Sequence, residues 1–188
     1  MKTIADRAIA NEEAVPMIIV MPDAWDTWYI NQYDGKAPYE DMFFEELIPY
    51  MEKTYRIRSN KESRAIAGLS MGGYGSFLYS LHHPDMFCAC APLSAAVFDD
   101  TVMEARKNKS HKDLFNRLFG PGDEHWQQNN VLKILSDWNQ NDLPKIRYYI
   151  DCGDDDGLLD GNMQVHQIMR QKGIKHEFRV RDGGHSWT

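Results

Sequence analysis

The chain has 188 residues, of which 43% are hydrophobic and 26% are charged, a balance typical of a globular domain rather than a disordered chain. Its formal net charge of −7 would repel nucleic acid and an anionic membrane surface, so roles in binding either are disfavoured. No apolar run approaches the ~20 residues of a spanning helix, and Met1–Ala10 lacks the apolar core of a secretory signal. The three cysteines indicate neither a disulfide framework nor a zinc site.

Short apolar runs alternate with amphipathic segments along the chain. The runs that we predict to be strands are Met17–Met21, Arg64–Leu69, Phe87–Leu93, Ile146–Cys152 and Lys175–Val180. Several are apolar on successive residues, which is typical of strands buried on both faces of a parallel sheet. The predicted helices are Thr3–Glu13, Tyr39–Thr54, Met71–His82, Thr101–Phe119 with a break, Asp123–Asp137 and Asp160–Lys172. This alternation predicts a single α/β domain over residues 1–188, with a mainly parallel sheet flanked by helices.

A candidate nucleophile lies between the second predicted strand and the helix that follows it. The pentapeptide Gly68-Leu69-Ser70-Met71-Gly72 fits the G-x-S-x-G pattern, in which a sharp strand-to-helix turn exposes a serine hydroxyl. We expect strained backbone at Ser70, and we expect Cβ atoms at positions 68 and 72 to collide with neighbouring backbone. The Met71 N–H is the expected oxyanion donor, at the N-terminus of a helix whose dipole favours negative charge. The alternatives are a glycine-rich turn of structural use only, and a phosphate-binding loop, which the absence of a following lysine disfavours.

A serine nucleophile needs a general base and a carboxylate that orients the base. Among seven histidines, His185 follows the last predicted strand in a glycine-rich loop, at the edge where catalytic groups of a parallel sheet gather, so we predict it as the base. The carboxylate is expected after the preceding strand, where Asp154, Asp155 and Asp156 are adjacent, and spacing alone does not choose among them. A metal-binding loop is disfavoured because the spacing of a calcium loop is not met, so we expect no metal and no cofactor.

The order of these motifs resembles the esterase D family of the α/β-hydrolase superfamily, which includes feruloyl and acetyl-xylan esterases, S-formylglutathione hydrolases and mycolyltransferases. The resemblance covers nearly the whole chain and is carried by Met17–Asp23, Glu46–Tyr50, Arg64–Gly75, Cys152–Leu158 and Gly183–His185. It implies an α/β-hydrolase fold in which Ser70 is the nucleophile, His185 is the base and Asp156 is the orienting acid.

The resemblance also places Trp28, Tyr29 and Asn31 where such esterases build part of the substrate pocket. Their aromatic rings could stack on a phenolic acid or a sugar. A loop anchored by buried aromatic side chains is an equally good interpretation.

The sequence departs from that family at both ends. Relatives carry a further strand and a His-Gly-rich loop, which donates the second oxyanion hydrogen bond, and they carry a final helix after the catalytic histidine. In the superfamily order, the missing strand lies between Met17–Met21 and Arg64–Leu69, so we expect a gap in the sheet. We therefore interpret the chain as truncated at both ends, lacking N-terminal strands and the C-terminal helix. The second oxyanion donor is unidentified, and losing one such donor lowers the rate by roughly 10²–10³.

The favoured function is a serine carboxylesterase that hydrolyses esters through an acyl-enzyme. The resemblance implies acyl groups on carbohydrates, of feruloyl or acetyl type, so the expected partner is a small-molecule or oligosaccharide ester. Acyl transfer to a sugar is the closest chemical alternative, and a non-catalytic carbohydrate-binding or scaffold domain is the alternative from another class. The set Ser70, Asp156 and His185 favours an enzyme, because a binding domain has no need of all three. The sequence specifies neither oligomeric state nor location, although relatives are often secreted or periplasmic.

Overall fold

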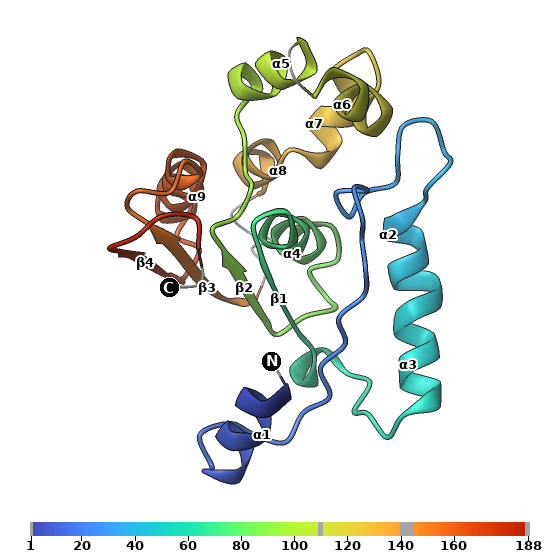
Figure 1. Ribbon diagram of the computed structural model, residues 1–188, viewed down its shortest axis with the longest axis vertical. Helices are drawn as coiled ribbons and strands as arrows, with labels where there is room; N and C mark the ends of the chain where they lie inside the picture. Colours follow the sequence, from blue (N-terminus) through green and yellow to red (C-terminus); the bar gives the residue numbers. More distant parts are fainter. Residues whose placement is uncertain (1, 109–110, 140–144, 187–188) are drawn as a thin grey trace.

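The computed structural model describes residues 2–108, 111–139 and 145–186, and Figure 1 shows its arrangement. Within these residues a four-stranded sheet has the order β1-β2-β3-β4, with the bounds Ala65–Leu69, Ala89–Leu93, Arg147–Gly153 and His176–Arg181. Every pairing is parallel. Each connection therefore crosses back over the sheet through helices, and the carboxyl ends of all four strands lie at one edge. The predicted α/β fold with a parallel sheet is confirmed.

The helices lie close to their predicted ranges, apart from the short 3₁₀ helix η2, which was not predicted. They are α1 Lys2–Ala10, α2 Tyr39–Asp41, η1 Met42–Leu47, α3 Ile48–Thr54, η2 Lys61–Ser63, α4 Met71–His82, α5 Asp100–Asn108, α6 Lys112–Phe119, α7 Glu124–Asn129, α8 Val131–Asp137 and α9 Leu159–Gln171. The predicted helix Tyr39–Thr54 forms as one continuous body from α2 to α3 (Figure 1). Its middle, η1, is π-helical and precedes Pro49, which has no N–H to donate and disfavours regular helix before it.

The predicted helix Asp123–Asp137 divides into α7 and α8 at Asn130. The side-chain oxygen of Asn130 accepts hydrogen bonds from the backbone N–H groups of Leu132 (3.0 Å) and Lys133 (3.3 Å). Asparagine is a strong N-cap because it satisfies N–H groups that have no partner within the helix. It therefore starts a new helix inside what the hydrophobic pattern predicts to be one. Within the described ranges, no helix has the length and apolar character needed to cross a membrane.

The predicted strand Met17–Met21 is wrong. The segment is coil, its five side chains are 41–69% exposed, and it forms no ladder with β1, which is the edge strand of the described sheet. Apolar residues raise the tendency to form a strand, but a strand also needs a neighbour for its N–H and C=O groups. This is the position at which the family's strand order predicts a gap.

The core lies where α4 packs against β1 and β2, and it continues beneath α8 and α9. Its largest fully buried side chains include Phe77 and Leu78 of α4 and Ile150 of β3. Cys90 and Cys152 are buried as free thiols, and Cys88 is half-buried and also free. The core thus fixes α4 relative to the sheet. Ser70, which directly precedes α4, is fixed with it.

Candidate active site

Ser70 occupies the turn between β1 and α4, within the elbow formed by residues 68–72. Its backbone has φ 60° and ψ −117°, a conformation that a non-glycine residue adopts only where the surrounding structure imposes it. The Ser70 N–H donates to the carbonyl oxygen of Leu93 (2.9 Å). The Ser70 carbonyl oxygen accepts from the N–H groups of Ala96 (2.9 Å) and Tyr74 (3.0 Å). The strained backbone expected at this serine is present.

The glycines of the elbow differ in their importance. A Cβ atom on Gly68 would lie 2.2 Å from the backbone oxygen of Gly72, so no side chain fits there. The expected collision at Gly72 is wrong, because a Cβ atom there would meet only the Tyr29 hydroxyl at 3.5 Å, an ordinary contact. Close packing instead requires glycine at Gly73, where a Cβ atom would lie 2.9 Å from the backbone of the segment after β2.

The hydroxyl of Ser70 is not used to cap α4. Serine at an N-cap commonly accepts a hydrogen bond from the first turn of its helix. Ser70 is the N-cap residue of α4 and makes no such bond, and its φ and ψ angles differ from the extended values of an ordinary N-cap. The N–H of Met71, the first residue of α4, has no acceptor within the helix. Ser70, which is half-buried, thus directly precedes an N–H that has no acceptor within its helix, at the positive end of the helix dipole.

Asp156 and His185 form the second part of the site. Asp156 Oδ2 lies 2.8 Å from Nδ1 of His185. The Asp156 side chain is 1% exposed, whereas the His185 side chain is 42% exposed. A carboxylate at Nδ1 holds the proton on that nitrogen and leaves Nε2 free to accept another. The His185 ring is therefore held in one orientation, with Nε2 on its more exposed side.

The neighbouring aspartates have different surroundings. Asp154 and Asp155 are exposed. Asp154 Oδ1 accepts a hydrogen bond from the N–H of Gly183 (2.9 Å) and so supports the loop that carries His185. Among the described residues, Asp156 is the aspartate of this trio that contacts the His185 ring. Burial and loop direction distinguish the three carboxylates that spacing alone leaves equivalent.

The pKa of Asp156 lies below its ordinary value. Burial by itself raises this pKa, but hydrogen bonds from His185, Ser94 and the Leu158 N–H outweigh the effect. The Leu158 N–H donates to Asp156 Oδ1 at 2.9 Å. Asp156 is thus ionised at neutral pH, as a carboxylate that stabilises an imidazolium must be.

Ser94 is a site residue that the sequence analysis missed. It follows β2, is 7% exposed, and has a positive φ of 40°. Its N–H donates to the carbonyl oxygen of Asp151 (2.7 Å), its hydroxyl donates to the Cys152 sulfur (3.9 Å), and it helps to lower the pKa of Asp156. The signal was available, because Ser94 directly follows a predicted strand at the same sheet edge that selects His185.

Ser70 and His185 both lie at the edge formed by the carboxyl ends of the strands. They follow the two outermost strands of the described sheet, β1 and β4. The structure contains no hydrogen bond between the Ser70 hydroxyl and the His185 ring, although both residues are among those it describes. Catalytic hydrogen bonds are often long in unliganded sites and tighten when substrate binds. The loops after β3 and β4 are in close contact, because a Cβ atom on Gly153 would lie 2.1 Å from the Gly183 oxygen.

The loop residues Trp28 and Asn31 have structural contacts. The Trp28 ring packs on Tyr74, Phe98 and Phe115, with centroid distances of 5.4–5.9 Å. The Asn31 amide donates to Asp41 Oδ1 (2.7 Å) and accepts from the Asp41 N–H (3.1 Å), which ties the loop to α2. These contacts agree with the interpretation of a loop anchored by buried side chains.

Tyr29 lies closer to the elbow. Its ring meets Tyr39 and Tyr79 edge-on and covers Gly75, where a Cβ atom would lie 2.5 Å from the ring. Its half-buried hydroxyl is the group that approaches Gly72. Of the three predicted pocket residues, Tyr29 is therefore the one with a polar atom beside the elbow.

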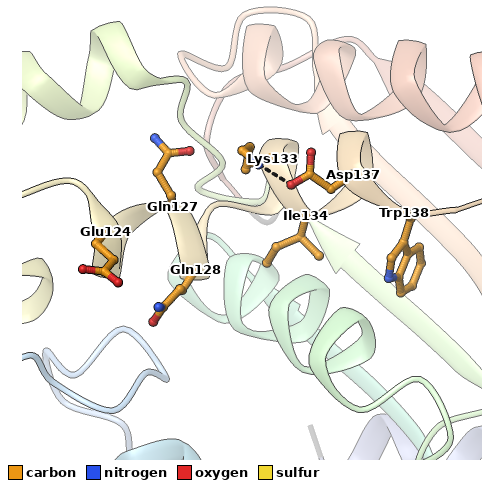
Figure 2. A pocket seen from close by; sticks show the side chains of 7 residues that line it. All are labelled: Glu124, Gln127, Gln128, Lys133, Ile134, Asp137 and Trp138. Carbon is orange, nitrogen blue, oxygen red and sulfur yellow. Dashed lines mark hydrogen bonds and ion pairs between the residues drawn. The ribbon is translucent and has the colours of Figure 1, made fainter.

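A surface hollow lies away from these residues. Figure 2 shows it over α7 and α8, bordered by side chains such as Gln128, Ile134 and Trp138. The lysine that lines it, Lys133, is paired with Asp137. No group of three or more histidine, cysteine, aspartate or glutamate side chains in the described part of the chain could hold a metal ion.

Comparison with known proteins agrees with this geometry. The family model named Esterase matches residues 1–188. The chain is 24% identical over 178 residues to the acetyl esterase of Caldicellulosiruptor saccharolyticus, covering 90% of this chain and 65% of that protein. A solved ferulic acid esterase superposes with a TM-score of 0.80 at 38% identity, covering 99% of this chain and 70% of that one. FphF, a fluorophosphonate-binding serine hydrolase of Staphylococcus aureus, superposes with a TM-score of 0.74 at 23% identity, covering 88% and 64%.

The acetyl esterase and FphF are each longer than this chain, which spans 65% and 64% of their lengths. The likeness to FphF shows the fold alone. The family rests on the model that matches the full length and on the ferulic acid esterase at 38% identity, of which this chain covers 70%. These two findings confirm the resemblance drawn from the motifs: the chain belongs to the Esterase family of α/β-hydrolases.

Proposed function

We propose that this chain carries the catalytic centre of a serine carboxylesterase that hydrolyses acyl esters of carbohydrates, of feruloyl or acetyl type, through an acyl-enzyme. The observation that carries the proposal is the hydrogen bond of 2.8 Å between His185 and the buried carboxylate of Asp156. A buried carboxylate on a solvent-facing imidazole, at the sheet edge that also holds a strained serine, is the arrangement that base-assisted acyl transfer requires.

In the proposed reaction, His185 Nε2 removes the proton of Ser70 as the hydroxyl oxygen attacks the ester carbonyl carbon. The developing oxyanion accepts a hydrogen bond from the Met71 N–H at the start of α4. The imidazolium, stabilised by Asp156, then protonates the departing alcohol. A water molecule, deprotonated by His185, attacks the carbonyl carbon of the acyl-enzyme; the acid is released as the bond to the Ser70 oxygen breaks, and that oxygen takes the proton back from His185. The step requires the exposed loop 182–186 to bring Nε2 within hydrogen-bond reach of Ser70.

The substrate class is supported by the relatives. A ferulic acid esterase and an acetyl esterase are both similar to this chain. Within the loop that precedes α2, we propose that the hydroxyl of Tyr29 contacts the bound ester, because it lies beside the elbow. Trp28 and Asn31 support this contact indirectly, by fixing the loop to the core and to α2.

A fluorophosphonate probe tests the proposal, because it reacts with a serine only when the serine is activated. We expect a covalent adduct on Ser70, identified by mass spectrometry, and none in Ser70→Ala. Ser76→Ala is the matched control, since Ser76 lies on α4 and its hydroxyl only donates to the Gly72 carbonyl oxygen of the same helix. The control should keep the adduct.

The Ser70→Ala variant should also fold normally. The Ser70 hydroxyl makes no capping hydrogen bond, so we expect the free energy of unfolding to change by no more than about 0.5 kcal/mol. A folded wild-type protein that forms no adduct would refute the hydrolase and would favour a carbohydrate-binding domain. A Ser70→Ala protein that does not fold would instead make Ser70 a structural residue.

A further inference from the structure

The segment after β2 lies between the two halves of the candidate site. We call residues 93–97 the strap; they are the last residue of β2 and the four residues that follow it. Because β2 is between β1 and β3 in the sheet, the strap lies between the elbow, which follows β1, and the Asp156 loop, which follows β3. Each side of the strap is in contact with one of these two segments.

On the first side, the strap holds the backbone of Ser70. The Ser70 N–H donates to the Leu93 oxygen, and the Ala96 N–H donates to the Ser70 oxygen, both at 2.9 Å. The backbone of Ala95 also touches the first turn of α4, at the position where Gly73 leaves no room for a Cβ atom. The position of Ser70 therefore follows the position of the strap.

On the second side, Asn162 of α9 connects the strap to the Asp156 loop, residues 154–158, which we call the acid loop. Asn162 is fully buried, with 0% of its surface exposed. Its amide nitrogen donates to two backbone oxygens, that of Ala95 in the strap (2.9 Å) and that of Leu158 (2.8 Å). Since both neighbours are carbonyl oxygens, the NH₂ group of the amide must face them. Leu158 in turn donates its N–H to the Asp156 carboxylate.

The start of α9 packs on the strap at one further point. A Cβ atom on Gly161 would lie 2.1 Å from the oxygen of Val97, so the backbones of α9 and the strap are in direct contact. Contact alone sets the separation of the two segments but leaves them free to slide. The Asn162 amide adds a directional bond, which fixes their register.

We propose that Asn162 is a positioning residue of the proposed esterase: by bonding the strap and the acid loop together, it keeps Asp156 and His185 aligned with Ser70. This inference rests on the proposed function for its effect on turnover. The predicted effect on the alignment of Asp156 and His185 does not depend on turnover, and the NMR measurement below tests it separately.

Asn162→Ser separates the two bonds of the amide. A serine in a helix can still donate to the carbonyl oxygen four residues earlier, here that of Leu158, but its side chain is too short to reach Ala95. We expect kcat for p-nitrophenyl acetate to fall roughly 10- to 100-fold with KM nearly unchanged, since small misplacements of catalytic groups have effects of this size. Asn162→Thr, which adds a methyl group to fill the space, serves the same purpose if the serine variant folds poorly.

Asn129→Ser is the matched control. Asn129 is also a buried asparagine, and its amide donates to the carbonyl oxygen four residues earlier, that of His125, at 2.8 Å. It lies on α7 and makes no bond to the strap. We expect its kcat to remain within about twofold of wild type. A similar loss in both variants would indicate a general loss of stability and would overturn the inference.

The second measurement is the downfield NMR resonance of the His185 Nδ1 proton, which reports the hydrogen bond to Asp156. We expect the resonance in the wild type and in Asn129→Ser, and a shifted or lost resonance in Asn162→Ser. If the wild type shows no adduct with fluorophosphonate and no turnover, the proposed function fails and this resonance alone decides the role of Asn162. A resonance and a kcat that Asn162→Ser leaves unchanged would refute the positioning role while the esterase stands.

Discussion

Replacing Asp156 by asparagine exchanges one carboxylate oxygen for an NH₂ group. The hydrogen bonds of the buried carboxylate determine which of the two oxygens is exchanged. One carboxylate oxygen of Asp156 accepts from the Leu158 N–H (2.9 Å), and the other faces His185 Nδ1 (2.8 Å). An asparagine has a single oxygen, and the Leu158 N–H must have an acceptor. The amide oxygen therefore remains at Leu158, and the NH₂ group faces the histidine.

This exchange inverts the proton arrangement of His185. An NH₂ group is a donor, so Nδ1 must become the acceptor, and the ring proton moves to Nε2. A ring that carries its proton on Nε2 cannot take the proton of Ser70. Loss of the correct tautomer in a serine triad lowers kcat by about 10⁴, which corresponds to about 5 kcal/mol of transition-state stabilisation.

The assay is the steady-state hydrolysis of p-nitrophenyl acetate, with kcat and KM determined separately. Asp154→Asn is the control, because an amide oxygen at position 154 still accepts from the Gly183 N–H (2.9 Å in the wild type) and the side chain is exposed. We expect Asp156→Asn to lower kcat by orders of magnitude and Asp154→Asn to leave it almost unchanged. The opposite pattern would assign the acid to Asp154, and an active Asp156→Asn enzyme would refute the tautomer argument.

Two further predictions concern stability. Gly68→Ala should lower the free energy of unfolding in urea by more than about 3 kcal/mol, because its Cβ atom would lie 2.2 Å from a backbone oxygen of the elbow. Gly157→Ala, which has open space around it, should change that free energy by no more than about 0.5 kcal/mol, and equal effects would contradict the packing argument. Burial lowers the pKa of His82, but its hydrogen bond with the buried Glu40 carboxylate outweighs burial and raises the pKa above its ordinary value. This pair stabilises the fold fully below a pH of about 6.5 and loses its contribution as the pH rises through the folded-state pKa, so Glu40→Gln should flatten the decrease in unfolding free energy above a pH of about 6.5. A wild-type slope in that variant would refute the coupling.

The sheet was predictable from its apolar runs, although the expected burial of the strands on both faces is wrong. The outer strands β1 and β4 carry exposed residues, and β3 alternates between buried and less buried positions. The four runs that begin at Arg64, Phe87, Ile146 and Lys175 each overlap a strand of the structure to within one or two residues at either end. In these four runs an apolar pattern and a neighbouring strand coincide. At Met17–Met21 they do not, because the pattern carries no information about whether a neighbouring strand is present.

The candidate site was predictable to the level of its motifs and loops. Ser70 and His185 follow from the position of a turn pattern and of a glycine-rich loop relative to predicted strands. The contact of Asp156 with His185 depends on which of three adjacent carboxylates turns inward. Spacing in the sequence does not select Asp156, whereas the resemblance to a family does. Whether Trp28 faces the core or a ligand depends on the packing of distant aromatic residues, which local sequence does not encode.

The place of Asn162 could not be deduced from its local sequence, and the reason lies in the topology. Within the described residues, Ser70 follows an edge strand, so neighbours that fix its strained backbone come from the β2 side. Those neighbours, Leu93 and Ala96, belong to the strap, and the strap is held against the acid loop by a side chain 92 positions further along the chain than Ser70. Strain persists only where the surroundings over-determine it. The geometry of Ser70 and the geometry of Asp156 therefore depend on the same segment, and a change that loosens the strap should disturb both at once.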